Sequence, residues 1–255
     1  MSDAGRGRIT TNLRRFAARR DLLRQRDTIT MSSATTAYLV ALAVTLIVVT
    51  VLLLTTVRVD ATALGRFAAL AAAAALAQLF VVRAPRNQTY HTTIVFLAAA
   101  VLLLPAALLP FVALVQHVPV LITGRQRLRF AAFNTLNHGL DMLAAAGVAT
   151  LVLDAHRQAN SRWALAGAAA LLTLVALNHV LLAIMITLTR GFTFAESSLF
   201  SVDSLAADLV PAALGLALAT FWLWAPWLLP TSVVPLFLIQ RSLVLLPNRL
   251  QPLHV

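Results

Sequence analysis

Residues 34–57, ATTAYLVALAVTLIVVTVLLLTTV, contain no charged side chain. A helix rises 1.5 Å per residue, so an apolar run of about 20 residues crosses a hydrocarbon core of about 30 Å. The composition agrees, because 60% of the 255 residues are hydrophobic and 11% are charged, whereas an ordinary soluble domain carries about 25% charged residues. The sequence therefore predicts an integral membrane protein embedded in a lipid bilayer.

Hydropathy predicts an all-α membrane protein, a polytopic bundle of about eight transmembrane helices. The third and fourth segments are short and contain Pro105, Pro110 and Pro119, so we expect one short, proline-broken hairpin and therefore seven or eight crossings. We expect a basic cytosolic leader in residues 1–33, the bundle in 34–246 and the start of an exit linker in 247–255. The predicted spans are 34–57, 61–82, 92–104, 108–122, 131–153, 163–188, 205–227 and 232–246.

The placement of arginine predicts the orientation in the membrane. The net charge is +11, no lysine is present, and eight of the twenty basic residues precede residue 27. Threading the spans from a cytosolic N-terminus leaves sixteen arginines inside and only Arg58, Arg66, Arg157 and Arg162 outside, which is the bias that cytosolic loops show. We therefore expect both termini in the cytosol, a multi-pass protein of the bacterial cytoplasmic (inner) membrane, and contact of the basic residues with lipid headgroups rather than nucleic acid.

A polar stripe interrupts the fifth predicted span. At 100° per residue, Asn134, Asn137, His138 and Asp141 fall within one arc of about 100°, so they are expected to face one partner or cavity rather than lipid. An ionisable residue at that depth is a candidate functional site. These four residues are our first sensing candidates.

Asn178 and His179 lie on the sixth span at a depth close to that of His138. Such a cluster is consistent with a ligand pocket, a proton-sensitive pair or a metal site, and interhelical hydrogen bonding is the structural alternative. His117 is expected to have a packing role. No spacing identifies a haem or a particular metal, so the cofactor is left open.

Arg241 falls near the level of Asp141 when residues are counted along the last span. An unpaired charge there would cost at least about 2.5–3.5 kcal/mol. We therefore expect an ion pair between Asp141 and Arg241, and the alternative is that Arg241 extends toward the interface. Residues 191–204, the longest inner loop, are consistent with an interfacial helix.

The chain contains none of the motifs that intramembrane enzymes and nucleotide hydrolases require. A His-Glu-x-x-His zinc motif, a Gly-x-Ser-Gly nucleophile, a Gly-x-Gly-Asp aspartate motif and a Walker pattern are all missing from the sequence, and there is no cysteine for thiol catalysis or a cysteine metal site. We therefore expect no catalytic activity from this chain alone.

Four short stretches carry a resemblance to a known group of proteins. They are YHTTIVF at 90–96, LLLP at 102–105, QHVP at 116–119 and FNTLN at 133–137. The chain resembles the polytopic membrane sensory regions that precede cyclic-di-GMP signalling domains in bacteria, chiefly GGDEF diguanylate cyclases and sometimes HD-type phosphodiesterases. The resemblance covers residues 35 to 250, and the FNTLN stretch is its most specific part.

The resemblance implies a sensory and regulatory module. Its last helix would continue into the cytosol through residues 247–255 toward an output domain, so Gln240 and Arg241 become transmission candidates. No Gly-Gly-Asp/Glu-Glu-Phe signature occurs, so the cyclase is expected in a longer parent, working as a homodimer. The stimulus would be a membrane state or a small hydrophobic or amphipathic ligand. The alternative is the substrate-binding membrane component of a vitamin-type transporter.

Overall fold

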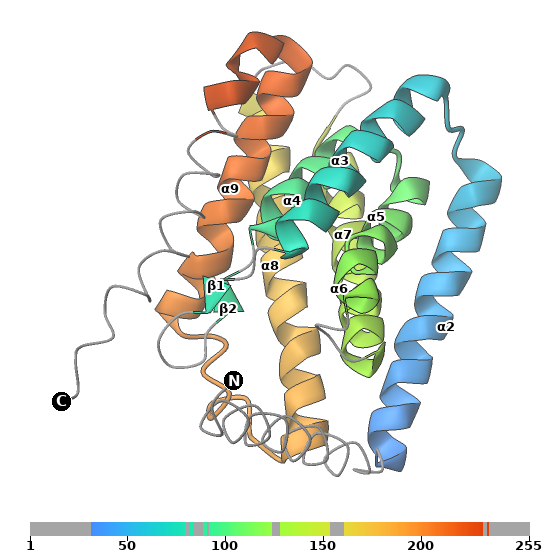
Figure 1. Ribbon diagram of the computed structural model, residues 1–255, viewed down its shortest axis with the longest axis vertical. Helices are drawn as coiled ribbons and strands as arrows, with labels where there is room; N and C mark the ends of the chain where they lie inside the picture. Colours follow the sequence, from blue (N-terminus) through green and yellow to red (C-terminus); the bar gives the residue numbers. More distant parts are fainter. Residues whose placement is uncertain are drawn as a thin grey trace, which may run out of the picture.

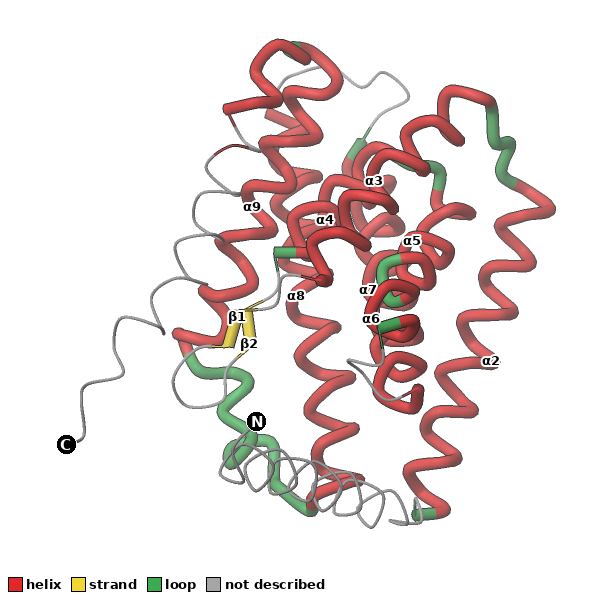
Figure 2. Tube along the Cα trace, in the orientation of Figure 1, coloured by secondary structure: helices red, strands yellow, loops and turns green. Residues whose placement is uncertain are grey.

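The computed structural model describes residues 32–79, 82–83, 89–90, 92–123, 128–153, 161–231 and 234. Within these ranges the protein is a bundle of helices (Figures 1 and 2), apart from one pair of two-residue antiparallel strands, β1 (Val82–Arg83) and β2 (Thr89–Tyr90). The strand pair was not predicted from the sequence. The basic leader up to residue 31, most of the last predicted span and the exit linker lie outside the described residues.

The long helices follow the predicted spans closely. The observed elements are α2 (Ser33–Thr56), α3 (Ala61–Leu79), α4 (Thr93–Leu103), the 3-10 turn η3 (Ala106–Leu108), α5 (Leu109–Val115), α6 (Val118–Ile122), α7 (Leu128–Val152), α8 (Ser161–Arg190), α9 (Val202–Trp224) and η4 (Pro226–Leu228).

Four of the described helices, α2, α3, α8 and α9, are long and apolar enough to cross a membrane. Such helices indicate a membrane protein. The outer position of α2 in Figure 1 agrees with this assignment, because most of its large apolar side chains face outward and are exposed, among them Val40, Val44 and Ile47. A soluble protein rarely exposes so continuous an apolar surface.

Helix α4 is short and lies inside the bundle. Every residue of the helix except Phe96 is buried, and α4 packs against α3, α5, α7, α8 and α9. Its 11 residues extend for only about 16 Å, which is half the thickness of the hydrocarbon core. Pro105 follows the C-cap of α4, so the expected interruption of this segment at a proline is present.

The residue that follows the end of α8 and the residue that precedes the start of α9 are both of types that favour a helix terminus. Gly191, with φ of 71°, follows α8 in the left-handed region that glycine adopts readily. The side chain of Ser201 accepts a hydrogen bond from the backbone N–H of Ser204 and caps α9. Between them, residues 191–201 form turns and bends. The interfacial helix considered for this loop is therefore absent from these residues, because Gly191 and the Ser201 cap fix the two helix ends.

Candidate functional site

The polar stripe of α7 points partly into the bundle. Asn137 and Asp141 are 2% and 1% exposed, whereas the side chain of His138 keeps 24% of its surface accessible and Asn134 is half-buried. Asn137 and Asp141 are four residues apart on one helix and therefore share a face. The most deeply buried polar groups of α7 are thus an amide and a carboxylate.

His138 connects Asp141 with the break between α5 and α6. Its Nδ1 lies 3.2 Å from Oδ2 of Asp141, and its ring stacks on that of His117, with centroids 6.1 Å apart and planes 14° apart. Gln116 Nε2 lies 3.3 Å from Nε2 of His117. Pro119 lacks an N–H, which removes a helical hydrogen bond here and helps to separate α5 from α6. His117 is buried, as its expected packing role requires, and also contacts the polar stripe.

Asn137 links α7 to α8, because its Nδ2 donates a hydrogen bond to Oδ1 of Asn178. Three buried oxygens in this region, Asn137 Oδ1, Asp141 Oδ1 and Gln116 Oε1, have no hydrogen-bond partner among the described residues. All three are acceptors, and an unmatched buried acceptor carries a desolvation penalty of about 1–3 kcal/mol. The arrangement can therefore accept a donor such as a water, a proton carrier or a cation.

The ring of His179 faces α9. Its Nδ1 lies 2.8 Å from the carbonyl oxygen of Val175, so this nitrogen is the N–H donor. Its Nε2 lies 3.4 Å from Oγ of Ser204 and 3.7 Å from Oδ2 of Asp208. The three residues that were expected to form one cluster therefore have different partners. Asn178 binds Asn137, His138 contacts Asp141, and His179 contacts Ser204 and Asp208, since consecutive helical residues point about 100° apart.

Asp208 is the main site residue that the sequence analysis missed. It lies in α9, within a predicted span, and its side chain is 32% exposed whereas that of His179 is 3% exposed. Asp141 was a candidate because an ionisable residue inside an apolar span is often functional, and the same reasoning applies to Asp208. Ser204 carried no comparable signal, since serine is common in membrane helices.

The bundle contains two histidine–aspartate pairs. His138 and Asp141 are paired within α7, and His179 of α8 is paired with Asp208 of α9. We refer to His138, Asp141, His179 and Asp208 as the His–Asp network.

In the part of the chain that the structure describes, no three histidine or acidic side chains lie close enough together to hold a metal ion. Gln240 and Arg241, the predicted transmission residues, lie outside the described residues. The predicted ion pair between Asp141 and Arg241 is therefore still a prediction, and the partner observed for Asp141 is His138.

Comparison of the chain with protein family models, with curated proteins and with solved structures finds no match.

Proposed function

We propose that this chain is a sensory and regulatory module of the bacterial cytoplasmic membrane, with both termini in the cytosol. A proton or a small ligand at the His–Asp network shifts the packing of α7, α8 and α9, and the last helix passes that shift to a cyclic-di-GMP output domain in a longer, homodimeric parent. Regulation of this kind requires a stimulus that binds one packing arrangement better than the other.

The geometry of His179 is the observation that carries the proposal. Its Nδ1–H is held by the carbonyl of Val175, so only Nε2 is free to change partner. A neutral ring accepts a hydrogen bond at Nε2 from the hydroxyl of Ser204, whereas a protonated ring donates from Nε2 to the carboxylate of Asp208. Histidine changes its charge more readily around neutral pH than any other unperturbed side chain. Protonation therefore exchanges one α9 partner for another.

The loop between α8 and α9 connects this exchange to the inner end of the bundle. The centroid of the Phe200 ring lies 6.1 Å from that of His179 and also 6.1 Å from that of Phe194. Glu196 holds the same loop by accepting hydrogen bonds from the N–H and hydroxyl of Thr193, and these bonds lower the pKa of Glu196. The bonds to the carboxylate are thus retained at neutral pH and lost only on strong acidification.

Hydrogen exchange of the loop at residues 191–201 tests the proposal. In nanodiscs, we expect the protection factor of the wild-type loop, which corrects for the intrinsic pH dependence of amide exchange, to change between about pH 5.5 and pH 8. Ser204→Ala removes the partner of the neutral ring and should move the midpoint of that change upward by about 0.5–1 pH unit. Asp208→Asn weakens the protonated state and should move the midpoint downward by a similar amount.

His179→Gln, which cannot titrate in this range, should abolish the change. Thr189→Ala serves as the control, because among the described residues its hydroxyl bonds within α8, to the carbonyls of Met185 and Ile186. Midpoint shifts of the same sign for Ser204→Ala and Asp208→Asn would rule out the exchange of partners at Nε2.

A small-solute transporter component is the second candidate, and the broken segment favours it. The break between α5 and α6 carries two buried polar residues, Gln116 and His117, directly against the polar stripe of α7. Membrane transporters often build their substrate sites at such interrupted helices. Native mass spectrometry and proteoliposome flux separate the two functions, because a transporter component retains or moves a solute, whereas a sensor responds without net flux.

A further inference from the structure

The packing of helix α9 changes at a proline in its interior. Pro211 lies within the helix, and none of residues 202–210 before it is buried. The buried residues of α9 all follow the proline, and they are Ala212, Gly215, Leu218 and Ala219. The helix therefore consists of a loosely packed first half, residues 202–210, and a tightly packed second half, residues 212–224.

The second half of α9 is held by contacts with both α4 and α8. At Gly215 the backbone of α9 lies against the carbonyl oxygen of Val95 in α4, where an added Cβ would collide. On the α8 side, Nε1 of Trp163 donates a hydrogen bond of 3.0 Å to Oγ1 of Thr220. The ring of Trp163 also meets that of Trp224 edge to face, with centroids 4.9 Å apart. The second half cannot move without breaking these contacts.

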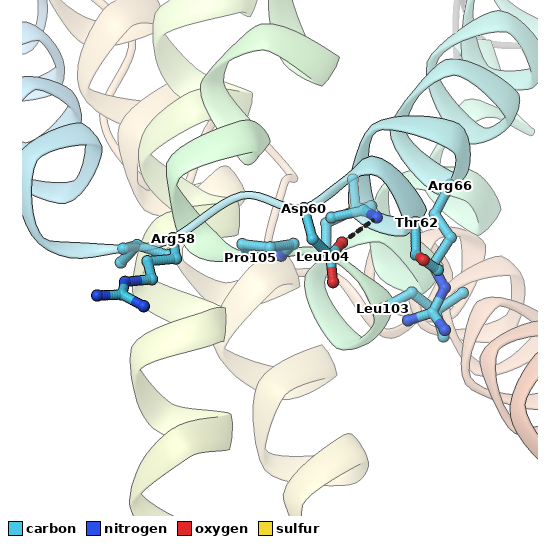
Figure 3. Close-up of a pocket in the computed structure, with 9 residues that line it drawn as sticks. Arg58, Asp60, Thr62, Arg66, Leu103, Leu104 and Pro105 are labelled. Carbon is cyan, nitrogen blue, oxygen red and sulfur yellow. Dashed lines mark hydrogen bonds between the residues drawn. The ribbon is translucent and has the colours of Figure 1, made fainter.

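Helix α4, on which the second half of α9 packs, is itself fixed to α3. At the start of α4, the hydroxyl of Thr93 donates a buried hydrogen bond of 2.9 Å to Oε1 of Gln78. At the other end, Leu104 and Pro105 line a pocket together with Asp60, the residue that precedes α3 (Figure 3). The support for the second half of α9 thus extends over the whole length of α4.

The first half of α9 meets the bundle through longer and partly exposed contacts. Ser204 Oγ and Asp208 Oδ2 lie 3.4 Å and 3.7 Å from Nε2 of His179, whereas a charge-assisted hydrogen bond to a carboxylate measures about 2.7–2.9 Å. Leu205 and Leu209 pack against the core but remain partly exposed. The first half is therefore less strongly held than the second.

Pro211 weakens the helix at the boundary between the two halves. A proline has no N–H, so the carbonyl oxygen of Ala207 has no helical donor at position 211, and the proline ring crowds the same carbonyl. Sharp bends in helices occur mostly at such residues. We propose that α9 bends at Pro211, so that residues 212–224 stay fixed on α4 and α8 while residues 202–210 swing with the loop that precedes them.

A hinge at this position enlarges small movements. Closing the 3.7 Å contact between Asp208 and His179 to a charge-assisted hydrogen bond, by rotation about Pro211, would move Asp208 by about 1 Å. Asp208 lies about 4.5 Å along the helix from Pro211 and Val202 lies about 13.5 Å from it, so Val202 would move by about 3 Å. This step rests on the proposed function, because it takes His179 as the group that moves the helix, whereas the hinge follows from the packing alone.

Distances between spin labels test the hinge, and labels can be attached selectively because the sequence contains no cysteine. Pulsed electron paramagnetic resonance in nanodiscs at one fixed pH compares Leu76→Cys/Val202→Cys with Leu76→Cys/Ala213→Cys. All three positions are exposed, and Leu76 lies on α3. We expect the distance distribution that ends at Val202 to be about 3 Å wider than the one that ends at Ala213.

Pro211→Ala restores the missing N–H and should remove at least about half of that excess width. Pro226→Ala is the matched control, because Pro226 is the first residue of η4, where a missing N–H breaks no helical hydrogen bond, and the excess should persist. Fraying at the start of α9 does not depend on residue 211, so it predicts no effect of Pro211→Ala.

The hinge is overturned if the two distributions are equally wide, or if Pro211→Ala leaves the excess width unchanged. The first comparison needs no proline variant, so it decides the question even if Pro211→Ala folds poorly. A wide distribution at Val202 in a protein whose loop shows no pH response would refute the proposed function and leave the hinge standing. Equal widths together with the expected pH response would refute the hinge alone.

Discussion

His138→Leu is expected to destabilise the bundle by about 2–4 kcal/mol at neutral pH, and the double variant His138→Leu/Asp141→Leu is expected to recover most of that loss. In the described structure Nδ1 of His138 lies 3.2 Å from Oδ2 of Asp141, which is 1% exposed. Removing one member of a buried pair leaves an uncompensated charge, whereas replacing both by apolar residues is often neutral or stabilising.

A double-mutant cycle in detergent, with unfolding followed by circular dichroism or a thermal shift, measures this coupling. Acidification neutralises the carboxylate, so the deficit of His138→Leu should shrink as the pH falls. Thr150→Leu, at an exposed position of the same helix, is the control for adding a leucine to α7. Strictly additive single effects would show that the two side chains act independently.

The helices were predictable from the sequence because their signal is local. Residues 34–57 and 61–82 predicted α2 and α3, since an apolar run bounded by charged residues such as Arg58 is recognised without knowledge of its neighbours. Pro105 and Pro119 likewise predicted the interruptions around α4, α5 and α6, because a proline lacks a backbone N–H donor in any context.

The pairing of polar groups was not predictable to the same degree. Counting residues placed Asn137 and Asp141 on one face of α7, but it could not show that Asn178 turns to Asn137 while its neighbour His179 turns to Asp208. These choices depend on how α7, α8 and α9 rotate against one another. That rotation is set by packing across the whole bundle rather than by any single span.

Small residues determine much of that packing. In an alanine-rich sequence, however, small residues are so common that they do not identify the packing positions. Gly139 of α7 lies against Leu46 of α2, and Gly167 of α8 lies against Leu216 of α9. Such positions let helices approach closely in a membrane, where packing rather than water exclusion drives association. Neither glycine stands out in the sequence as a packing position.

Gly215→Ala is expected to lower the stability of the bundle by about 1–3 kcal/mol, the usual cost of overpacking a well-filled core. A Cβ at this position of α9 would collide with the backbone carbonyl oxygen of Val95 and with Cβ of Ala98, both on the buried helix α4. A backbone atom cannot rotate away, so α4 and α9 would have to separate. The effect should outweigh the gain of about 0.5–1 kcal/mol that alanine normally brings to a helix interior.

Gly147→Ala is the matched control, because it makes the same change inside α7 where, apart from the adjoining backbone of α7 itself, no described atom lies within 4 Å of the added carbon. Its melting temperature in detergent should equal or exceed that of the wild type, while that of Gly215→Ala should fall by several degrees. Since α9 also carries Ser204 and Asp208, separation of α4 from α9 should also alter the pH response of the loop at residues 191–201. Equal melting temperatures for the two variants would mean that α9 does not pack on α4 as closely as the glycine contact requires.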